Sequence, residues 1–185
     1  MDFLLGFILG LGLAAAAGFR IFVPLLLVSI AAFTGHLELS DSFAWVGTPP
    51  ALIMFAVATF LEIVAFFIPW FDNLLDSLAV PASVICGTML MALALMDVDP
   101  LLKWSVAIIA GGGTAGIIQG ATAGLRLGST ATTGGTANPV LSGAETAGAF
   151  ILGVLALVLP LLAGLLVLLL FFYIARKILR RVTQR

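Results

Sequence analysis

Four charged residues stand inside apolar segments of the chain, where they could act on an ion or a solute: Arg20, Glu62, Arg126 and Glu145. An arginine near the middle of a bilayer costs at least about 2.5–3.5 kcal/mol, so it needs water or a partner. We therefore expect the two arginines either to bind an anionic group or to pair with the two glutamates. Alternatively, each arginine reaches the membrane surface from a short half-helix, because long basic side chains extend toward the headgroups.

Glu62 is the strongest single candidate for a functional carboxylate. It lies eleven residues after Ala51 in an apolar run that ends at Pro69, close to mid-span. Its protonation would couple to ion or proton movement, and a structural ion pair with an arginine is the competing explanation. Glu145 follows Pro139 by six residues, near the positive end of a helix dipole. That dipole stabilises a carboxylate without any function.

Two further polar groups are candidates for an ion or solute path. Asp72 and Asp76 lie one helical turn apart and could present two carboxylates to a cation, or could be solvated at the membrane surface. The segment 128–138 contains Thr132, Thr133 and Asn138. Irregular backbone at membrane depth requires protein or a water-filled cavity around it. We therefore expect either a re-entrant, cavity-lining loop here or an ordinary surface loop.

Other classes of function find no support in the sequence. It has no His-Glu-x-x-His, Gly-x-Ser-x-Gly or phosphate-binding Gly-x-x-x-x-Gly-Lys motif, so we expect no enzyme. The formal net charge of −1 argues against a nucleic-acid partner. His36 is the only histidine and Cys86 the only cysteine, so we expect no metal site and no cofactor.

The composition indicates the elements that must position these residues. Hydrophobic residues make up 62% of the chain and charged residues 9%, whereas soluble domains carry about 45–50% and about 25%. We expect one all-α membrane domain over residues 1–185, a polytopic transmembrane bundle of five or six spans with broken helices. The first apolar stretch, from Phe3 to Phe33, predicts a broken or strongly tilted helix. The later spans are expected at 49–68, 78–96, 103–127 and 139–173, the last divided or bent at Pro160.

The chain also matches itself at an offset of 106 residues. The small residues and the arginine of the first segment fall on equivalents in the second: Gly6, Gly10, Gly18 and Arg20 on Gly112, Gly116, Gly124 and Arg126. Small residues four apart let another backbone approach closely. We expect an internal repeat of residues 1–96 and 103–175, inverted if three spans separate the copies and parallel if the number is even. A chance match of common membrane-helix glycines is the alternative.

The C-terminal residues 176–185 hold five of the eight basic residues directly after an apolar run. Because basic residues accumulate on the cytoplasmic side, we expect a cytoplasmic tail on a multi-pass protein of the inner membrane.

Three motifs resemble a known family. They are the segments 18–24, 68–81 and 129–139, of which Thr-Thr-Gly-Gly to Asn-Pro within the last is the most specific. With them the chain resembles the bacterial membrane family called domain of unknown function 4126. That family has no assigned reaction, so the resemblance implies a membrane protein with these motifs as its shared core and implies no activity.

The functional hypothesis is a small transporter or channel-like carrier for an ion or solute. Its path would lie between the two glycine-striped helices within the lipid bilayer, and these helices could also join subunits of a homo-oligomer. The alternative is a non-transporting membrane scaffold or lipid-interacting protein, in which the glycines mediate packing alone.

Overall fold

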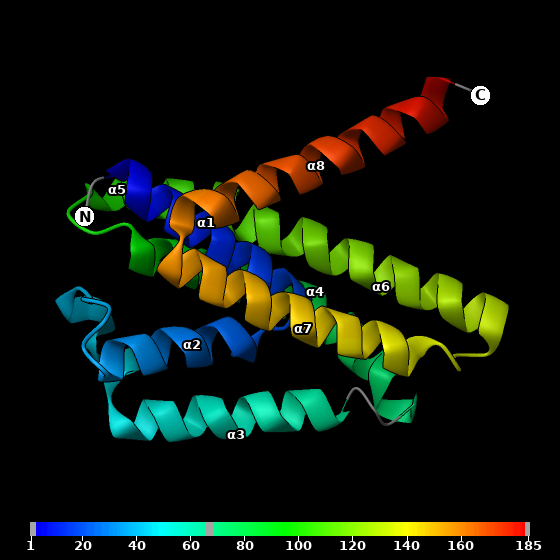
Figure 1. Ribbon diagram of the computed structural model, residues 1–185, viewed down its shortest axis with the longest axis horizontal. Coiled ribbons are helices and arrows are strands. Elements are labelled where there is room, and N and C mark those ends of the chain that lie inside the picture. Colours follow the sequence, from blue (N-terminus) through cyan, green and yellow to red (C-terminus); the bar gives the residue numbers. More distant parts are fainter. Residues whose placement is uncertain (1–2, 66–68, 184–185) are drawn as a thin grey trace.

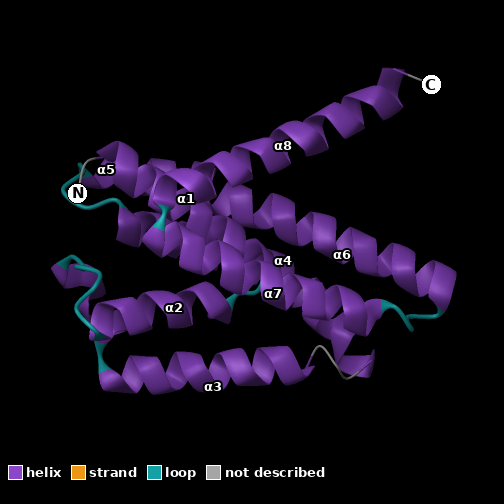
Figure 2. Cartoon of the chain, in the orientation of Figure 1, coloured by secondary structure: helices purple, strands orange, loops and turns teal. Residues whose placement is uncertain are grey.

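The computed structural model describes residues 3–65 and 69–183, which form helices joined by short connections and contain no strand (Figures 1 and 2). The all-α fold is confirmed for these residues. The helices, in chain order, are α1 (Phe3–Phe19), α2 (Phe22–Phe33), the 3₁₀ helix η1 (Asp41–Gly47), α3 (Pro49–Ala65), α4 (Pro69–Ala94), α5 (Pro100–Val106), the π-helical η2 (Ala107–Gly112), α6 (Gly113–Thr133), α7 (Asn138–Val158) and α8 (Pro160–Thr183).

Helix α1 is the centre of the bundle, because α4, α6, α7 and α8 all pack against it. Every residue from Leu9 to Gly18 is buried, and small side chains dominate this stretch. A Cβ atom at Gly6 would lie 2.5 Å from the carbonyl oxygen of Ala94, and one at Gly10 would lie 2.6 Å from the Sδ atom of Met91. Glycine therefore lets the backbones of α1 and α4 touch, and the order of these contacts makes the two helices antiparallel.

The first apolar stretch reverses direction at Arg20 and Ile21. Figure 1 shows α1 running away from the N-terminal end of the molecule and α2 returning toward it. A Cβ atom at Gly153 would meet Leu27 at 2.6 Å and Ala16 at 3.9 Å, so residues eleven positions apart in the sequence lie against one point of α7. The stretch from Phe3 to Phe33 is therefore not one tilted helix: it is interrupted at Arg20 and Ile21, where the chain folds back on itself.

The second half of the chain begins at the turn around Asp99, whose carboxylate accepts hydrogen bonds from the backbone N–H groups of Leu101 and Leu102 at 3.0 and 3.3 Å. This cap starts α5, which continues through η2 into α6. Pro160 divides the last apolar stretch into α7 and α8. Helix α8 extends past Arg176 to Thr183, so the basic tail expected from residue 176 begins as helix.

The two helices that carry the aligned glycines point in the same direction. Gly111 lies against Gly87, and Gly116 lies against Val84, so α4 is antiparallel to η2 and α6 as well as to α1. In Figure 1, α1 and α6 both run away from the N-terminal end. The inverted repeat is therefore not the arrangement of these segments, since an even number of reversals separates them.

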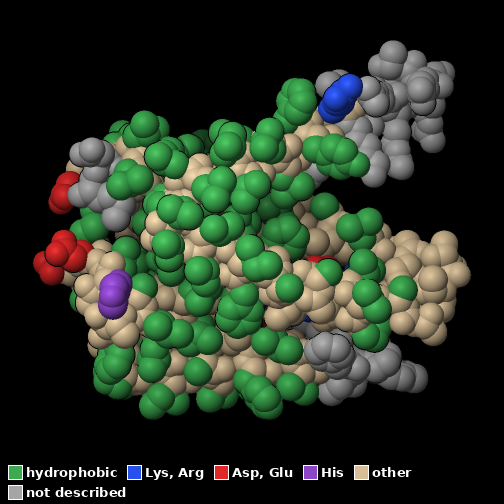
Figure 3. All heavy atoms as spheres, in the orientation of Figure 1, with side chains coloured by type: hydrophobic (Ala, Val, Ile, Leu, Met, Phe, Trp, Pro, Cys, Tyr) green, Lys and Arg blue, Asp and Glu red, His purple; other side chains and the backbone are tan. Residues whose placement is uncertain are grey.

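Several helices have the length and apolar character of membrane spans. Among the described residues, the continuous unit Pro100–Thr133 and helix α7 can cross a membrane, and η1 with α3, bent by 63°, makes a third candidate. The other apolar helices are 10–17 residues long, so the expected five or six spans stay a prediction. Hydrophobic side chains cover the face seen in Figure 3, while acidic side chains gather at the end near the N-terminus. These features are those of a helical membrane protein.

Candidate functional site

Three of the four charged candidates meet in one buried cluster. Arg126 on α6 binds Glu145 on α7 through both its Nη2 atom and its Nε atom, the latter at 3.2 Å from Oε1. The Nη2 atom of Arg20, which follows α1, lies 3.5 Å from Oε2 of the same carboxylate. The exposed fractions of the Arg20 and Arg126 side chains are only 0% and 2%. The cluster therefore joins α1, α6 and α7 by ionic contacts inside the bundle.

Helix α7 presents a polar face to Arg20. Ser142, Glu145 and Thr146 share this face because residues three and four positions apart lie on one side of a helix. The Nε atom of Arg20 donates to Oγ1 of Thr146 at 3.0 Å, and its Nη2 atom donates to the backbone oxygen and Oγ of Ser142 at 3.0 and 2.5 Å. Arg20 is thus fully buried and held by several acceptors on one helix.

Glu62 binds the backbone at the reversal between α1 and α2. Its Oε1 atom accepts a hydrogen bond from the N–H group of Ile21 at 2.8 Å, and Oε2 accepts one from Phe22 at 3.0 Å. The first N–H groups of a helix lack partners within it, so a carboxylate from α3 satisfies those of α2. Glu62 belongs to none of the ion pairs among the described residues, and both arginines instead contact Glu145.

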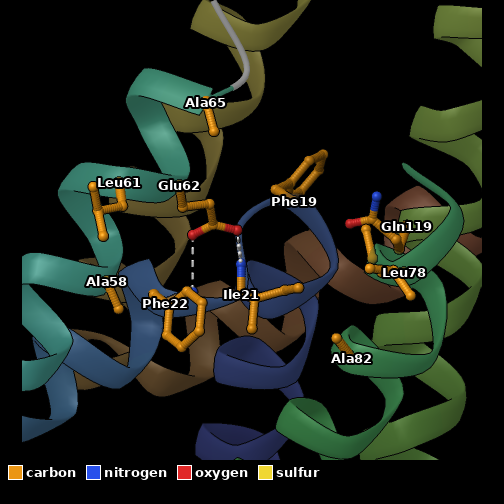
Figure 4. Close-up of a pocket in the computed structure, with 11 residues that line it drawn as sticks. Phe19, Ile21, Phe22, Ala58, Leu61, Glu62, Ala65, Leu78, Ala82 and Gln119 are labelled. Carbon is orange, nitrogen blue, oxygen red and sulfur yellow. Dashed lines mark hydrogen bonds between the residues drawn. The ribbon is translucent and has the colours of Figure 1, made fainter. Parts of the chain in front are cut away.

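A pocket of about 510 Å³ lies beside this reversal, and Glu62 contributes to its wall. Figure 4 shows Glu62 on α3 facing Gln119 on α6 across the space, with Phe19 between them. All described lining residues except Glu62 and Gln119 are apolar. An apolar pocket with a few convergent polar groups is the usual form of a small-molecule site.

The segment 128–138 is mostly helical and not an irregular loop, with only residues 134–137 between α6 and α7. Helix α6 continues to Thr133 and ends at Gly134, which adopts a left-handed φ of 64°. Thr132 and Thr133 are exposed, and their hydroxyl groups donate to the carbonyl oxygens of Gly128 and Ser129. These two hydroxyls serve their own helix and lie outside the charged cluster.

The remaining candidates lie away from the cluster or outside the described side chains. Asn138 begins α7, and its Nδ2 atom donates to Oγ1 of Thr130 at 3.1 Å, which ties the two ends of the α6–α7 connection. Asp72 and Asp76 belong to α4, but their side chains lie outside the described part of the structure. No group of three or more His, Cys, Asp or Glu side chains among the described residues could hold a metal ion.

Sequence reasoning missed three polar residues of this region: Ser142, Thr146 and Gln119. The first two could have been found from their spacing with Glu145, since the pattern i, i+3, i+4 predicts one polar face. Gln119 is the only glutamine or asparagine between the Asp97–Pro100 turn and Asn138. A lone amide in an apolar helix is costly to bury, so, like a charge, it indicates a polar site.

The comparisons with known proteins identify a family and no relative of known activity. No curated protein and no solved structure matches the chain. The family model described as "Domain of unknown function (DUF4126)" matches residues 7–180, which include α2 to α7 entirely and most of α1 and α8. The chain therefore belongs to the DUF4126 family.

Proposed function

We propose that this protein is a small membrane transporter or channel-like carrier for an ion or solute. The observation that carries the proposal is the buried cluster of Arg20, Arg126 and Glu145 in an otherwise apolar bundle. Removing such charges from water costs roughly several kcal/mol for each ion. Because apolar residues of similar volume often give an equally stable or more stable fold, stability alone does not explain why these charges are buried. Ionisable residues inside a membrane domain typically mark an ion or substrate pathway.

The backbone near the cluster supports the same function. Between α1 and α2 the chain leaves the helical conformation at Arg20, and Glu62 faces the first N–H groups of α2. Carriers commonly build their binding sites from interrupted helices whose termini point at a ligand or an ion. The pocket beside Glu62 supplies the space that such a site needs. The described geometry thus combines a helix interruption, a carboxylate and a pocket.

The distribution of charge favours one orientation in the membrane. Glu38, Asp41, Asp97 and Asp99 lie in the connections that follow α2 and α4, at the N-terminal end of the molecule (Figures 1 and 3). Four of the five basic C-terminal residues belong to the last turns of α8, at the opposite end of the molecule. Because basic residues accumulate on the cytoplasmic side, we propose an inner-membrane protein with a cytoplasmic C-terminus.

A membrane scaffold is the second candidate, and one observation favours it. Gly120, Gly124 and Gly128 form a line on α6, and a Cβ atom at any of them would meet nothing within 4 Å. Such a row of small residues is suited to close contact with another helix, including one from a second copy of the chain. The two functions differ in whether the buried charges are needed for flux or only for assembly.

Flux through sealed proteoliposomes tests the proposal. We expect saturable movement of at least one member of a panel of protons, alkali cations, halides and small organic solutes. Glu62→Gln and Arg20→Ala should abolish this flux, because each removes a charge at the helix interruption. The matched controls are Glu38→Gln and Arg176→Ala, which make the same chemical changes at exposed positions.

The result is interpretable only if the variants fold, so each is first compared with the wild type by size-exclusion chromatography. Flux that survives in both buried variants would contradict a path through this site. Flux equal to that of empty liposomes for every solute, combined with altered assembly of Arg20→Ala, would favour the scaffold.

A further inference from the structure

The pocket beside Glu62 has a composition that selects one class of ligand. Its apolar wall comes from α2, α3, α4 and the end of α1, with Phe19, Phe22 and Leu61 as the larger side chains. A volume of about 510 Å³ falls within the range of sites that hold small organic molecules. A ligand that fills this wall must therefore carry a substantial apolar body.

Glu62 is the single charged group among the described lining residues. Each of its oxygens accepts one backbone hydrogen bond, from Ile21 and Phe22. A carboxylate has about four lone-pair sites, so both oxygens retain capacity for another donor. The guanidinium groups of Arg20 and Arg126 contact Glu145 and do not line the pocket. The charge that a ligand meets at the wall is therefore negative.

Gln119 supplies the second polar group from the opposite side. The residue is only 3% exposed, and its side-chain amide makes no hydrogen bond to any described residue. Figure 4 shows this amide directed into the pocket from α6, opposite the Glu62 carboxylate. The amide oxygen and nitrogen are not among the fully buried polar atoms that lack a partner, so they open onto the pocket and are free to bind a polar group of a ligand there.

We propose that this pocket binds an organic cation, a protonated amine on a compact apolar body. The ammonium group donates to the Glu62 carboxylate, the Gln119 amide binds a second polar group or another N–H, and the body packs on the apolar wall. An anion is repelled by Glu62, and a hydrocarbon chain alone leaves Gln119 without a partner. The inference rests on the proposed function only in treating this ligand class as the transported one.

A matched pair of ligands tests the proposal on the full chain in lipid nanodiscs. The probes are 1-aminoadamantane and 1-hydroxyadamantane, which have nearly the same shape and differ in charge at neutral pH. Binding is measured by equilibrium dialysis against protein-free nanodiscs, which corrects for partition into lipid. We expect the amine to bind at least about tenfold more tightly than the alcohol, since hydrogen bonds to charged groups are the stronger ones.

Variants assign the binding to this pocket. Glu62→Gln should remove the preference for the amine, while Glu38→Gln, an exposed control, should leave it unchanged. Ala82→Leu, which fills the pocket from α4 without changing a charge, should weaken binding of both ligands. Equal binding of amine and alcohol to the wild type would overturn the proposal. So would amine binding that survives Ala82→Leu, because the amine would then bind elsewhere.

The same ligands separate this inference from the proposed function. Specific amine binding without flux of any solute in proteoliposomes leaves the binding site standing and contradicts the carrier. Saturable flux of another solute, with no preference for the amine in binding, supports the carrier and overturns the ligand class.

Discussion

Helix α1 and the continuous η2–α6 unit share three aligned glycines and an arginine two residues after the last of these, yet the two helices meet different surroundings. A Cβ atom at Gly18 of α1 would lie 2.7 Å from Cβ of Ile118 and 2.8 Å from the carbonyl oxygen of Ala115. Its equivalent in α6, Gly124, has open space within 4 Å. A stripe of small residues thus permits a close neighbour without supplying one.

The arginines at the ends of the two stripes converge although the glycines do not share an environment. Helices α1 and α6 pack together and point the same way, with Gly18 beside Ala115 and Ile118, so both arginines lie toward the same end of the bundle. Toward that end, α7 offers Glu145 to both Arg20 and Arg126. Of the matched residues, the two arginines therefore share a role, since both contact Glu145. The glycines do not, because each packs against the helix that happens to lie beside it.

The largest expected effect comes from removing the carboxylate that both regions share. Glu145→Ala leaves Arg20 and Arg126 buried without their common anion, and breaking a buried ion pair in this way costs about 3–5 kcal/mol. Thermal unfolding of the purified variant in detergent should show a clearly lowered melting temperature. Glu38→Ala is the control at an exposed site, with an effect within about 0.5 kcal/mol. Equal melting temperatures for both variants would mean that the cluster does not hold the helices together.

The direct test of the comparison is the same substitution in each stripe. Gly18→Ala forces a methyl group against Ile118 and Ala115, and overpacking of this kind costs about 1–3 kcal/mol. Gly124→Ala meets no atom and gains about 0.5–1 kcal/mol from helix propensity. The two melting temperatures should therefore shift in opposite directions. A loss of stability at Gly124 would indicate that another helix covers α6 in the purified protein.

An effect smaller than that at Gly18 is expected at the end of α6. Gly134 closes the helix with φ of 64°, a conformation in which a residue with a Cβ atom pays about 1–2 kcal/mol. Gly134→Ala should lower the melting temperature modestly, and Gly128→Ala, inside the helix with nothing within 4 Å, should raise it. The reverse order would show that the end of α6 is not held as described.

The sequence predicts much of the fold and part of the site, for identifiable reasons. Pro49, Pro100, Pro139 and Pro160 lie in the first turns of their helices, where proline is tolerated, so these boundaries could be read directly. The reversal at Arg20 could not, since an apolar stretch gives no sign of whether the chain continues or folds back.

The residues of the site could likewise be predicted from the sequence only in part. Arg20, Arg126 and Glu145 could be selected as candidates from the sequence, because a charged side chain is costly in an apolar helix. Their pairing depends on the relative direction of α1 and α6, which follows from the number of reversals between them. For Glu62 the sequence leaves two roles open, a carboxylate coupled to ion or proton movement and an ion pair with an arginine. In the structure it binds the N-terminus of α2, because that helix begins directly after the reversal.

The most direct test of transport does not require knowledge of the substrate. A carrier must expose its pocket to water on each side of the membrane, so a cysteine in the pocket should react with a membrane-impermeant maleimide applied to either side. Cys86 is the only native cysteine and is 5% exposed, so Cys86→Ser provides a clean background. Ala82→Cys reports on the pocket, and Ala156→Cys, at a position with 0% exposure, is the control.

In oriented, sealed vesicles, we expect the cysteine at position 82 to be labelled from both sides and the one at 156 from neither. Labelling at position 82 from one side only, or from neither, would contradict a path that crosses the membrane through this pocket.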